Sequence, residues 1–537
     1  MSLPGSLTFT LDGQQVTVDA VAAAVPSAAG VGAAAVDHGS LLEVLRDRLG
    51  VRSVKDGCSP QGQCGCCTVW VDGQPRVACV TPAARVAGRA VTTVSGAVES
   101  TALAERLCAS GGSQCGFCTP GIVMRLAALP EVQRTPDRVG QALLAHMCRC
   151  TGWQTIVEAV TSSGNGGAPR GGRRDLAVAV RRAAIEGGTV QAVSPQVALG
   201  LGGFPADSAP VDALHAVRAV DGSWHVAPTL TAARLAAGKV QGRRTTVAIR
   251  WPIEVPAGTW ARTLQTTWVE PAYLEPPAAW CVPGGEPVTG LANGGAFGAK
   301  APGLSEGTGA APVADNLGTI ARRLADMHGQ PVIAAWSRED IVRCGAKRPP
   351  IAGGVRADGS GVLRVARTPG IAAAIAAVAP SLHVEEVDVV GPPTSAAVRA
   401  AGWAEAAVLL APSDGWIIGP GGGAAHADML DGVVRIAVRC GDVLDLTVLR
   451  SYCIGAAHMA LGWVRSEAVR VDDDGEPLDL TIRSFGVLRA IDMPRVELVV
   501  DDDSGAPVNA SDAVFAAVAL AAWRHAGMPP RWPTMRS

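Results

Sequence analysis

The stretch Lys55-Asp-Gly-Cys-Ser-Pro-Gln-Gly-Gln-Cys-Gly-Cys-Cys-Thr68 decides how the first part of this chain folds. It places Cys58, Cys64 and Cys67 on one short loop, and Cys79 follows after a segment that is typical of a hairpin. Three close cysteines and a distant fourth form the plant-type [2Fe–2S] pattern, although here five residues, not the usual four, separate the first two. The spacing therefore predicts an iron–sulfur cluster bound by these four thiolates.

The same loop contains three glycines and one cysteine that is not among the four predicted ligands. Gly57, Gly62 and Gly65 lack a Cβ, so nearby backbone N–H groups can approach the sulfides of a cluster and stabilise its negative charge. Cys66 is the thiol that the four-ligand pattern does not need. Ten of the 14 cysteines fall within the first 150 residues, so metal binding is expected in this part of the chain.

Four further cysteines form two close pairs, Cys115 with Cys118 and Cys148 with Cys150. Pro120 is typical of the first turn of a helix, and Thr135 followed by a proline is an N-cap signal for a helix that runs to about Met147. Both pairs are therefore expected at helix ends, where unpaired N–H groups can face an anionic cluster. Two close cysteine pairs also describe a structural zinc site. The first group favours iron, because two metal sites of one redox type make a path for electrons.

Three motifs make the chain similar to a known family. The stretches 55–68, Gln114-Cys-Gly-Phe-Cys-Thr-Pro-Gly121 and Cys148-Arg-Cys-Thr-Gly152 together resemble the iron–sulfur subunit or domain of the molybdenum hydroxylases. That family includes xanthine dehydrogenase, aldehyde oxidoreductase and carbon monoxide dehydrogenase. The resemblance covers roughly residues 5 to 162.

The resemblance implies two cluster domains. A β-grasp, ferredoxin-like domain at residues 1–92 would carry one [2Fe–2S] cluster on Cys58, Cys64, Cys67 and Cys79. A helical-bundle domain at residues 93–162 would carry the other on Cys115, Cys118, Cys148 and Cys150. In the family, the glutamine at the position of Gln114 and the backbone at Cys150 contact the pterin of the molybdenum cofactor. Electrons would pass from molybdenum through the second cluster to the first.

Composition narrows the class of protein. The chain has 537 residues, enough for roughly three or four domains, and a formal net charge of −2, which gives no reason to expect nucleic acid or an anionic membrane as a partner. The apolar run Ala20–Val36 is mostly alanine and contains proline and glycine, so it is too weakly hydrophobic to span a membrane. The chain shows no leader, and its thiols have metal-ligand spacing, so we expect a cytoplasmic protein with reduced cysteines.

Residues 163–174 have the composition of a flexible linker, and residues 175–537 are expected to form a mixed α/β region. In it we predict a helix over residues 175–186, short strands such as Thr245–Arg250, and a helix over residues 513–525 that Ser511 or Asp512 caps. The complete prediction is an α+β multidomain fold: β-grasp, helical bundle and mixed α/β region.

The mixed region also resembles the molybdopterin-binding subunit of the same family. Thr267–Pro277 is similar to the family's substrate-side strand, and Asn293–Lys300 to its glycine-rich loop near the pterin. Three stretches nearer the C-terminus add to the likeness: 455–462, 479–485 and 492–494. A glycine-rich loop lets backbone N–H groups come close to a cofactor. The candidate cofactor-binding residues of this loop are Gly294, Gly295, Phe297 and Gly298.

Two departures from the family matter. The region after the linker is about half as long as a typical molybdenum subunit, so part of the usual pocket is missing or comes from elsewhere. The family's catalytic glutamate has no counterpart, because the corresponding stretch Ser504–Ala510 contains no carboxylate that could act as a general base. Glu467, Glu270 or Glu275 could substitute only where the fold places them at the reacting centre.

These observations predict an oxidoreductase component that passes electrons from a molybdenum centre through two [2Fe–2S] clusters to a flavin or another acceptor. Its cofactors would be the two clusters and molybdopterin, with the cytosine dinucleotide as one form, bound in this chain or at an interface. The substrate would be a small molecule hydroxylated at a C–H bond. FAD is expected only on a flavoprotein partner, and a larger molybdenum subunit would complete a hetero-oligomer. The alternative is a non-catalytic relay and scaffold subunit whose molybdenum site lies on a partner chain.

Overall fold

The computed structural model describes residues 6–19, 38–161, 174–239, 242, 244–290, 295–300, 317–501 and 504–535. The run Ala20–Val36, almost all of the predicted linker and Gly294 lie outside these residues. The domain boundaries at 92, 162 and 174 stay predictions. No helix among the described residues is long and apolar enough to cross a membrane.

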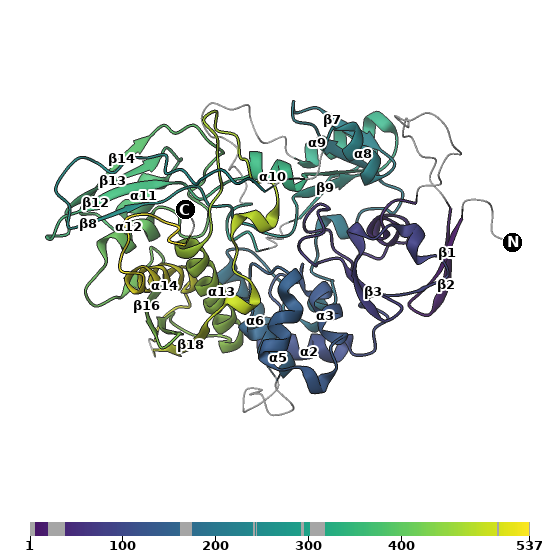
Figure 1. Ribbon diagram of the computed structural model, residues 1–537, viewed down its shortest axis with the longest axis horizontal. Helices are drawn as coiled ribbons and strands as arrows, with labels where there is room; N and C mark the ends of the chain where they lie inside the picture. Colours follow the sequence, from purple (N-terminus) through teal and green to yellow (C-terminus); the bar gives the residue numbers. More distant parts are fainter. Residues whose placement is uncertain are drawn as a thin grey trace.

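A five-stranded sheet forms the first part, drawn in purple in Figure 1. Its strand order is β2-β1-β5-β3-β4, and the central pair β1 and β5 is parallel while the other pairs are antiparallel. The strands are β1 (Leu7–Leu11), β2 (Gln14–Val18), β3 (Thr68–Val71), β4 (Gln74–Val77) and β5 (Ala90–Thr92). Helix α1 (Leu41–Glu43) begins after Ser40 and continues into the π-helical turn η1 (Val44–Arg48). This arrangement is the predicted β-grasp, and its β3–β4 hairpin separates the loop of three cysteines from Cys79.

Helices form the second part, drawn in blue beside the sheet in Figure 1. They are α2 (Ser100–Ser110), α3 (Thr119–Ala127), α4 (Pro136–Ala142) and α5 (Gln154–Thr161). Pro120 lies in the first turn of α3, and the Thr135 hydroxyl accepts a bond from the Arg138 N–H at 3.4 Å, as predicted. The helix expected to reach Met147 ends at Ala142, and the short 3₁₀ turn η5 (Leu143–Ala145) follows it. The chain leaves the helix here because the Met147 N–H donates to the carbonyl of Cys64 at 3.0 Å.

Within its described residues, the carboxy-terminal region contains three sheets with helices packed on them. The first has the order β10-β9-β11-β6-β7 and the second β14-β13-β12-β8. Their strands are β6 (Leu214–Arg218), β7 (Trp224–Ala227), β8 (Arg262–Gln265), β9 (Ala278–Cys281), β10 (Val288–Thr289), β11 (Val332–Ala335), β12 (Ile351–Val355), β13 (Gly361–Ala366) and β14 (Leu382–Val387). The helices in this stretch are α6 (Leu176–Gly187), α7 (Pro195–Ala198), α8 (Leu230–Ala236), α9 (Leu317–His328), α10 (Arg338–Cys344), α11 (Ile371–Ala376) and α12 (Trp403–Leu410).

The last sheet packs with two long helices, and one of them, α13, contacts the cysteine-rich part. Its order is β15-β16-β17-β18, with strands β15 (Ile417–Ile418), β16 (Ala424–Leu430), β17 (Val433–Arg439) and β18 (Arg495–Val500). Helix α13 (Leu446–Arg465) packs against α14 (Ser511–His525) and α6. One continuous hydrophobic core joins this sheet and its helices to the β-grasp and helical parts. The α+β multidomain fold is therefore as predicted, and α13 lies next to the helical part (Figure 1).

Three local predictions in the carboxy-terminal region are wrong. Thr245–Arg250 forms no strand, because its backbone bonds to Arg470 and Asp479 side chains and not to a neighbouring strand. Thr267–Pro277 is irregular apart from one bridge at Val269, since β8 already ends at Gln265.

The cap of α14 is the third correction. The helix begins at Ser511, and its N-cap is Ala510, whose side chain cannot accept a hydrogen bond. The carboxylate of Glu186, at the end of α6, accepts bonds from the N–H groups of Ala510 (3.3 Å) and Ser511 (2.9 Å). The distant Glu186 therefore satisfies the first two N–H groups, and the local side chain that takes part is Asn509, whose Oδ1 accepts from the Asp512 N–H at 3.1 Å.

Candidate metal centres

The first four predicted cysteines lie together in the structure. Contacts between sulfurs link them in the order Cys64, Cys58, Cys79 and Cys67, and the sulfur of Cys66 also contacts that of Cys64. All four are buried, with Cys79 the most exposed at 7%. Hydrogen bonds donated by the neighbouring thiols of Cys64 and Cys79 hold the pKa of Cys58 well below its usual range. Such crowding of sulfurs in a buried place suits a cationic metal centre, which would neutralise the thiolates.

Backbone donors face this group of sulfurs. The Gln61 N–H donates to Cys58 Sγ at 3.1 Å, and the Cys79 N–H points at Cys67 Sγ at 3.4 Å. A Cβ on Gly57 would lie 3.2 Å from Cys64 Sγ, so glycine leaves room beside the sulfurs. These donors would stabilise the negative charge of a cluster, as predicted from the loop.

The second four cysteines also form one group. Their sulfurs are linked in the order Cys118, Cys148, Cys150 and Cys115, and Cys150 Sγ lies 3.5 Å from Cys115 Sγ. The sulfur of Cys148, and then burial, raise the pKa of the Cys118 thiol. The Thr151 hydroxyl lies 3.2 Å from Cys148 Sγ. The fold thus brings together all eight cysteines that the sequence singled out, four at each place.

The two cysteine groups are in direct contact through their loops. Met147 donates its N–H to the Cys64 carbonyl, and Met147 is bonded to Cys148, so one hydrogen bond separates a residue of one group from a neighbour of the other. A Cβ on Gly121 would lie 2.2 Å from the Gly65 carbonyl oxygen, which shows how closely α3 approaches the first loop. The imidazole of His146 is buried between the loops. This proximity suits electron transfer between two centres.

Thiolates bind both iron and zinc, so the type of ligand fits a metal centre but does not distinguish between the two metals. Among the described residues, no group of three or more His, Cys, Asp or Glu side chains has the geometry of a single bound metal ion. The fit to iron–sulfur clusters rests on eight buried thiols in two linked groups and on the N–H donors that face them.

Gln114 and Cys150 meet α13 of the carboxy-terminal region. The Gln114 amide donates to the Cys150 carbonyl at 3.0 Å and to the Ser451 hydroxyl at 2.8 Å. A Cβ on Gly455 would lie 1.7 Å from the Cys150 carbonyl oxygen, so α13 packs directly on the cysteine loop. Gln114 Oε1 is buried and has no hydrogen-bond partner among the described residues. That acceptor fits a ligand with an N–H donor, such as a pterin.

The described part of the predicted glycine-rich loop approaches the same place. A Cβ on Gly295 would lie 3.0 Å from Cys150 Sγ. The Phe297 ring lies edge-on to Tyr452 of α13, with 6.1 Å between ring centroids. Gly298 has a φ of +88°, and a Cβ there would lie 1.7 Å from the Ala397 carbonyl, so both its conformation and its space require glycine. The loop therefore lies beside the second cysteine group.

The three candidate carboxylates are all paired with cations, of which Arg149 and Lys347 are buried and Lys300 is partly buried. Glu467 accepts two bonds of 2.6 Å from the Arg149 guanidinium, between Cys148 and Cys150. Glu270 pairs with Lys347 at 2.9 Å, and Glu275 pairs with Lys300 at 2.7 Å. Burial raises the pKa of Glu275, while Lys300 opposes that rise. A carboxylate in such a pair is engaged structurally, and none of the three is placed as an unpaired general base.

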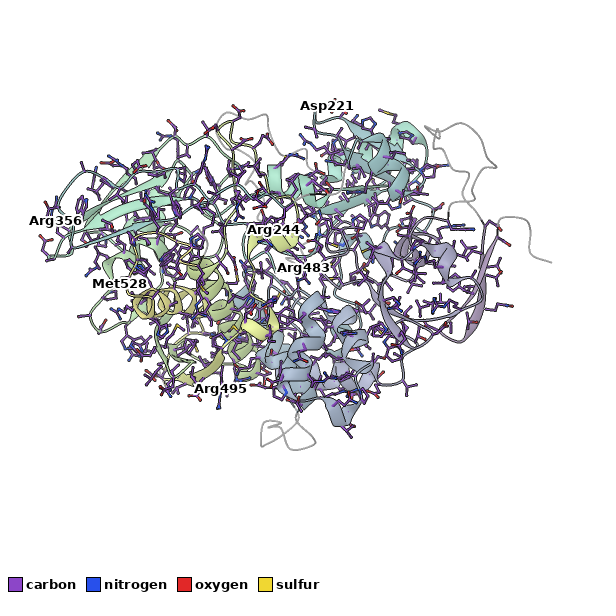
Figure 2. The ribbon with its side chains drawn as sticks, in the orientation of Figure 1. Asp221, Arg244, Arg356, Arg483, Arg495 and Met528 are labelled. Atoms are coloured by element: carbon purple, nitrogen blue, oxygen red, sulfur yellow. The ribbon has the colours of Figure 1, made fainter. Side chains whose placement is uncertain are left out.

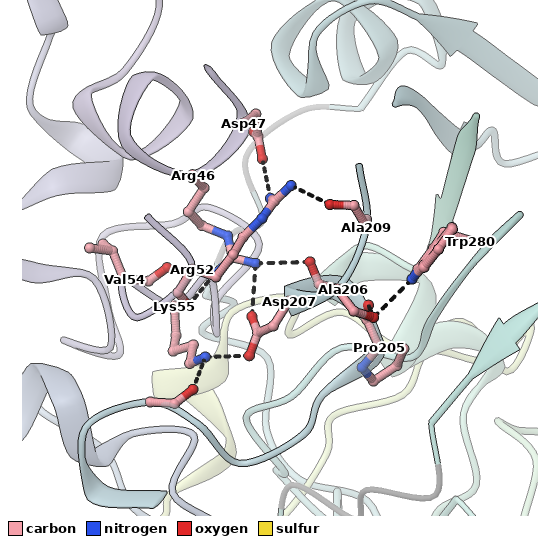
Figure 3. Close-up of polar contacts among 12 residues, drawn as sticks. Arg46, Asp47, Arg52, Val54, Lys55, Pro205, Ala206, Asp207, Ala209 and Trp280 are labelled. Carbon is pink, nitrogen blue, oxygen red and sulfur yellow. Dashed lines mark hydrogen bonds and ion pairs between the residues drawn. The ribbon is translucent and has the colours of Figure 1, made fainter. Parts of the chain in front are cut away.

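Sequence reasoning missed the contacts that join the first cysteine loop to the carboxy-terminal region. Figure 3 shows Lys55 and Arg46 converging on Asp207, 152 residues after Lys55 in the chain. The Lys55 ammonium also donates to the Gly200 carbonyl at 2.7 Å, and burial lowers its pKa to about 8. A single basic residue before a cysteine loop carries no signal of so distant a partner.

Two arginines from the carboxy-terminal region also reach this loop. Arg338 of α10 donates to the Gly57 carbonyl, next to Cys58. Arg483 donates to the Gln63 carbonyl at 2.7 Å, and Figure 2 places it near the middle of the molecule. Two cations of the carboxy-terminal region therefore lie beside the first cysteine loop, which also carries the carboxyl group of Asp56.

Comparison with known proteins identifies the cysteine-rich part. A family model described as a [2Fe-2S] binding domain matches residues 93–161. The xanthine dehydrogenase iron-sulfur-binding subunit of Escherichia coli O157:H7 is 39% identical over 133 residues, which cover 24% of this chain and 82% of that protein. The aldehyde oxidoreductase of Megalodesulfovibrio gigas is 42% identical over 134 residues, which cover 23% of this chain and 15% of that protein.

Longer relatives match over a small part of their length. Aldehyde oxidase 1 of Oryctolagus cuniculus is 41% identical over 135 residues, which are 22% of this chain and only 10% of the relative. For the whole chain, the solved structure of the aldehyde oxidoreductase from Desulfovibrio gigas has a TM-score of 0.67 at 14% identity, covering 99% of both chains. At that identity the likeness shows a common fold.

Proposed function

Since the chain belongs to the molybdenum hydroxylase family, we propose that it carries electrons from a molybdenum centre through two [2Fe–2S] clusters to a flavin or another acceptor. The family match supports an iron–sulfur electron-transfer role for an oxidoreductase. The observation that carries the finer proposal is the direct contact between the two cysteine loops, where the Met147 N–H meets the Cys64 carbonyl at 3.0 Å.

The proposed ligands are the two groups of four cysteines. The first cluster would be bound by Cys58, Cys64, Cys67 and Cys79, and the second by Cys115, Cys118, Cys148 and Cys150. The chain's own part is to hold the thiolates in place, to exclude water and to aim backbone N–H groups at the sulfurs. When bound, each cluster supplies a carrier of single electrons.

Molybdopterin is proposed beside the second cysteine group. Gln114 Oε1 would accept from the pterin, while Gly295, Phe297 and Gly298 shape the neighbouring loop. Gly294 belongs to the same proposal by its sequence alone. The cofactor would supply the oxidative hydroxylation of a small molecule, and FAD would sit on a partner chain.

A second candidate function is a non-catalytic relay and scaffold. The observation that favours it is the pairing of Glu467, Glu270 and Glu275 with cations, together with the lack of a carboxylate in Ser504–Ala510. In that case the molybdenum site would belong to a larger partner subunit. Helix α13, packed on Cys150, would then act as the surface that fixes the second cluster.

Metal analysis of the full chain after anaerobic purification tests both functions. We expect about four irons per chain, two for each cluster. Stoichiometric molybdenum would support the first function, and four irons without molybdenum would support the relay. A Cys148→Ser variant should lose about two irons while its matched control, Cys453→Ser on α13, should lose none. Zinc in place of iron in the unaltered chain would contradict both.

A further inference from the structure

Arg338 is a buried cation at the border between the carboxy-terminal region and the first cysteine loop. It is the first residue of α10, and its side chain is 0% exposed. The guanidinium donates to backbone carbonyls only: Tyr273 at 2.9 Å, Leu274 at 3.2 Å, and Gly57. Backbone carbonyls are dipoles, so they satisfy hydrogen bonds but do not cancel the charge.

No carboxylate lies within ion-pair distance of Arg338 among the described residues. The acidic residues that follow it on α10 serve other cations, because Glu339 pairs with Arg234 at 3.4 Å and Asp340 pairs with Lys239 at 2.6 Å. Of the acidic residues near Tyr273, Glu275 is held by Lys300. A charge buried without a partner is strongly unfavourable, so a negative charge is expected nearby.

The adjacent anionic group would be the first cluster. The Gly57 carbonyl carbon is bonded to the nitrogen of Cys58, so Arg338 reaches the loop one residue before a proposed ligand. Four thiolates give a [2Fe–2S] centre net negative charge, and reduction by one electron adds another. A buried positive charge beside it would favour the reduced form.

We propose that Arg338 is the counter-ion of the first cluster and raises its reduction potential, so that an electron leaving the second cluster passes to the first. It is a positioning residue that acts through its charge and touches no substrate. The inference rests on the proposed function, since it requires a cluster on Cys58. The second cluster provides the contrast, because its neighbouring cation, Arg149, is neutralised by Glu467 at 2.6 Å.

An electron paramagnetic resonance redox titration of the full chain tests the proposal. In Arg338→Gln, the amide can still donate to a carbonyl but has no charge. Its first-cluster signal should titrate at a potential lower by about 59 mV or more, which is a tenfold change for a one-electron couple. The second-cluster signal in the same sample should not move. Cys58→Ser, which removes the first cluster, assigns the two signals.

Arg343→Gln is the matched control. Arg343 lies on the same helix, is 30% exposed and pairs with Glu476 at 3.4 Å, so its loss should leave both potentials unchanged. Arg338→Lys keeps the charge but not the planar fork, and its first cluster should titrate near the unaltered potential.

An Arg338→Gln protein with both clusters present and an unshifted first potential would overturn the proposal. If Arg338→Gln does not fold, the Arg338→Lys protein provides the test. A first-cluster reduction potential close to that of the unaltered chain supports the role of the charge, and a shift of about 59 mV, a tenfold change in the equilibrium, overturns it. A chain without any iron signal would instead reject the proposed function, so the two failures are distinguishable.

Discussion

The two cysteine groups have the same ligand type and nearly the same burial, but they differ in the charges around them. Beside the first group lie Arg338, which has no carboxylate partner among the described residues, and the partly exposed Arg483. Beside the second group lies Arg149, which Glu467 neutralises with two hydrogen bonds of 2.6 Å. The carboxy-terminal region therefore gives the two centres unequal electrostatic surroundings, independently of any chemistry of its own.

The difference in surrounding charge would favour electron transfer from the second cluster to the first. A cation without a counter-ion favours the reduced state of a nearby cluster, and a neutralised one has little effect. The first cluster is therefore expected to be the better electron acceptor of the two.

The largest expected effect comes from removing a ligand. Cys58→Ser should abolish the first cluster and about half of the iron, leaving the second cluster's spectrum, because the two groups are separate sets of sulfurs. Cys66→Ser is the matched control, since this buried neighbour of the ligand loop lies outside the proposed four. Iron content and absorption spectra measure both. Equal iron loss in the two variants would show that the ligand set is wrongly assigned.

The second-largest effect is expected from breaking the Arg149–Glu467 ion pair beside the second cysteine group. Glu467→Gln leaves Arg149 buried with an uncompensated charge, so the free energy of unfolding should fall by about 3–5 kcal/mol. The second cluster's potential should rise, which narrows the difference between the clusters. Chemical denaturation and redox titration measure these effects. If the variant folds and the second cluster keeps its potential, neutralisation of Arg149 by Glu467 does not explain a difference between the two clusters.

Alkaline pH should act on the contacts that hold the first loop to Asp207. Burial lowers the pKa of Lys55 to about 8, below its usual 10.5, so between these pH values the unfolded chain holds more protons than the folded one. The contribution of Lys55 to the free energy of unfolding should therefore rise by about 3 kcal/mol from pH 8 to 10.5 and stay level below pH 8. Lys55→Met should lose that rise when unfolding is measured across the window. A variant that keeps the rise would assign it to another group.

The smallest effect is expected from Arg483→Gln. This side chain is partly exposed, so water screens its charge, and the first cluster's equilibrium should change by roughly threefold, or about 0.6 kcal/mol. The same redox titration measures it. A shift larger than that of Arg338→Gln would reverse the ranking of the two cations.

The sequence predicted the cysteine-rich part well because its signals are local. Spacing brings Cys58, Cys64 and Cys67 onto one loop, and Thr135 and Pro136 mark a helix start by interactions within one turn. The β3–β4 hairpin turns at Asp72-Gly73, where both residues have positive φ, a short-range hairpin signal. Only the end of α4 was misjudged, since the bond from Met147 to Cys64 is a contact between domains.

The carboxy-terminal region was harder to predict because its contacts are distant. Helix α14 begins more than 300 residues after Glu186, yet the Glu186 carboxylate, and not the side chain of Ser511 or Asp512, accepts the N–H groups at its start. Thr245–Arg250 alternates like a strand but finds no strand to pair with. Arg338 and Asp207 show no pattern that reveals their positions beside the first loop. Secondary-structure propensity and residue spacing do not predict hydrogen bonds and ion pairs between residues that are far apart in the sequence and meet only in the folded chain.

Electron paramagnetic resonance of the anaerobically reduced full chain, with the spins counted, shows whether the chain binds two [2Fe–2S] clusters. Two clusters should give two distinct [2Fe–2S] signals that together integrate to about two spins per chain. The signal that Cys58→Ser removes should appear first as the potential is lowered. A colourless chain that holds zinc and gives no such signals would contradict the account.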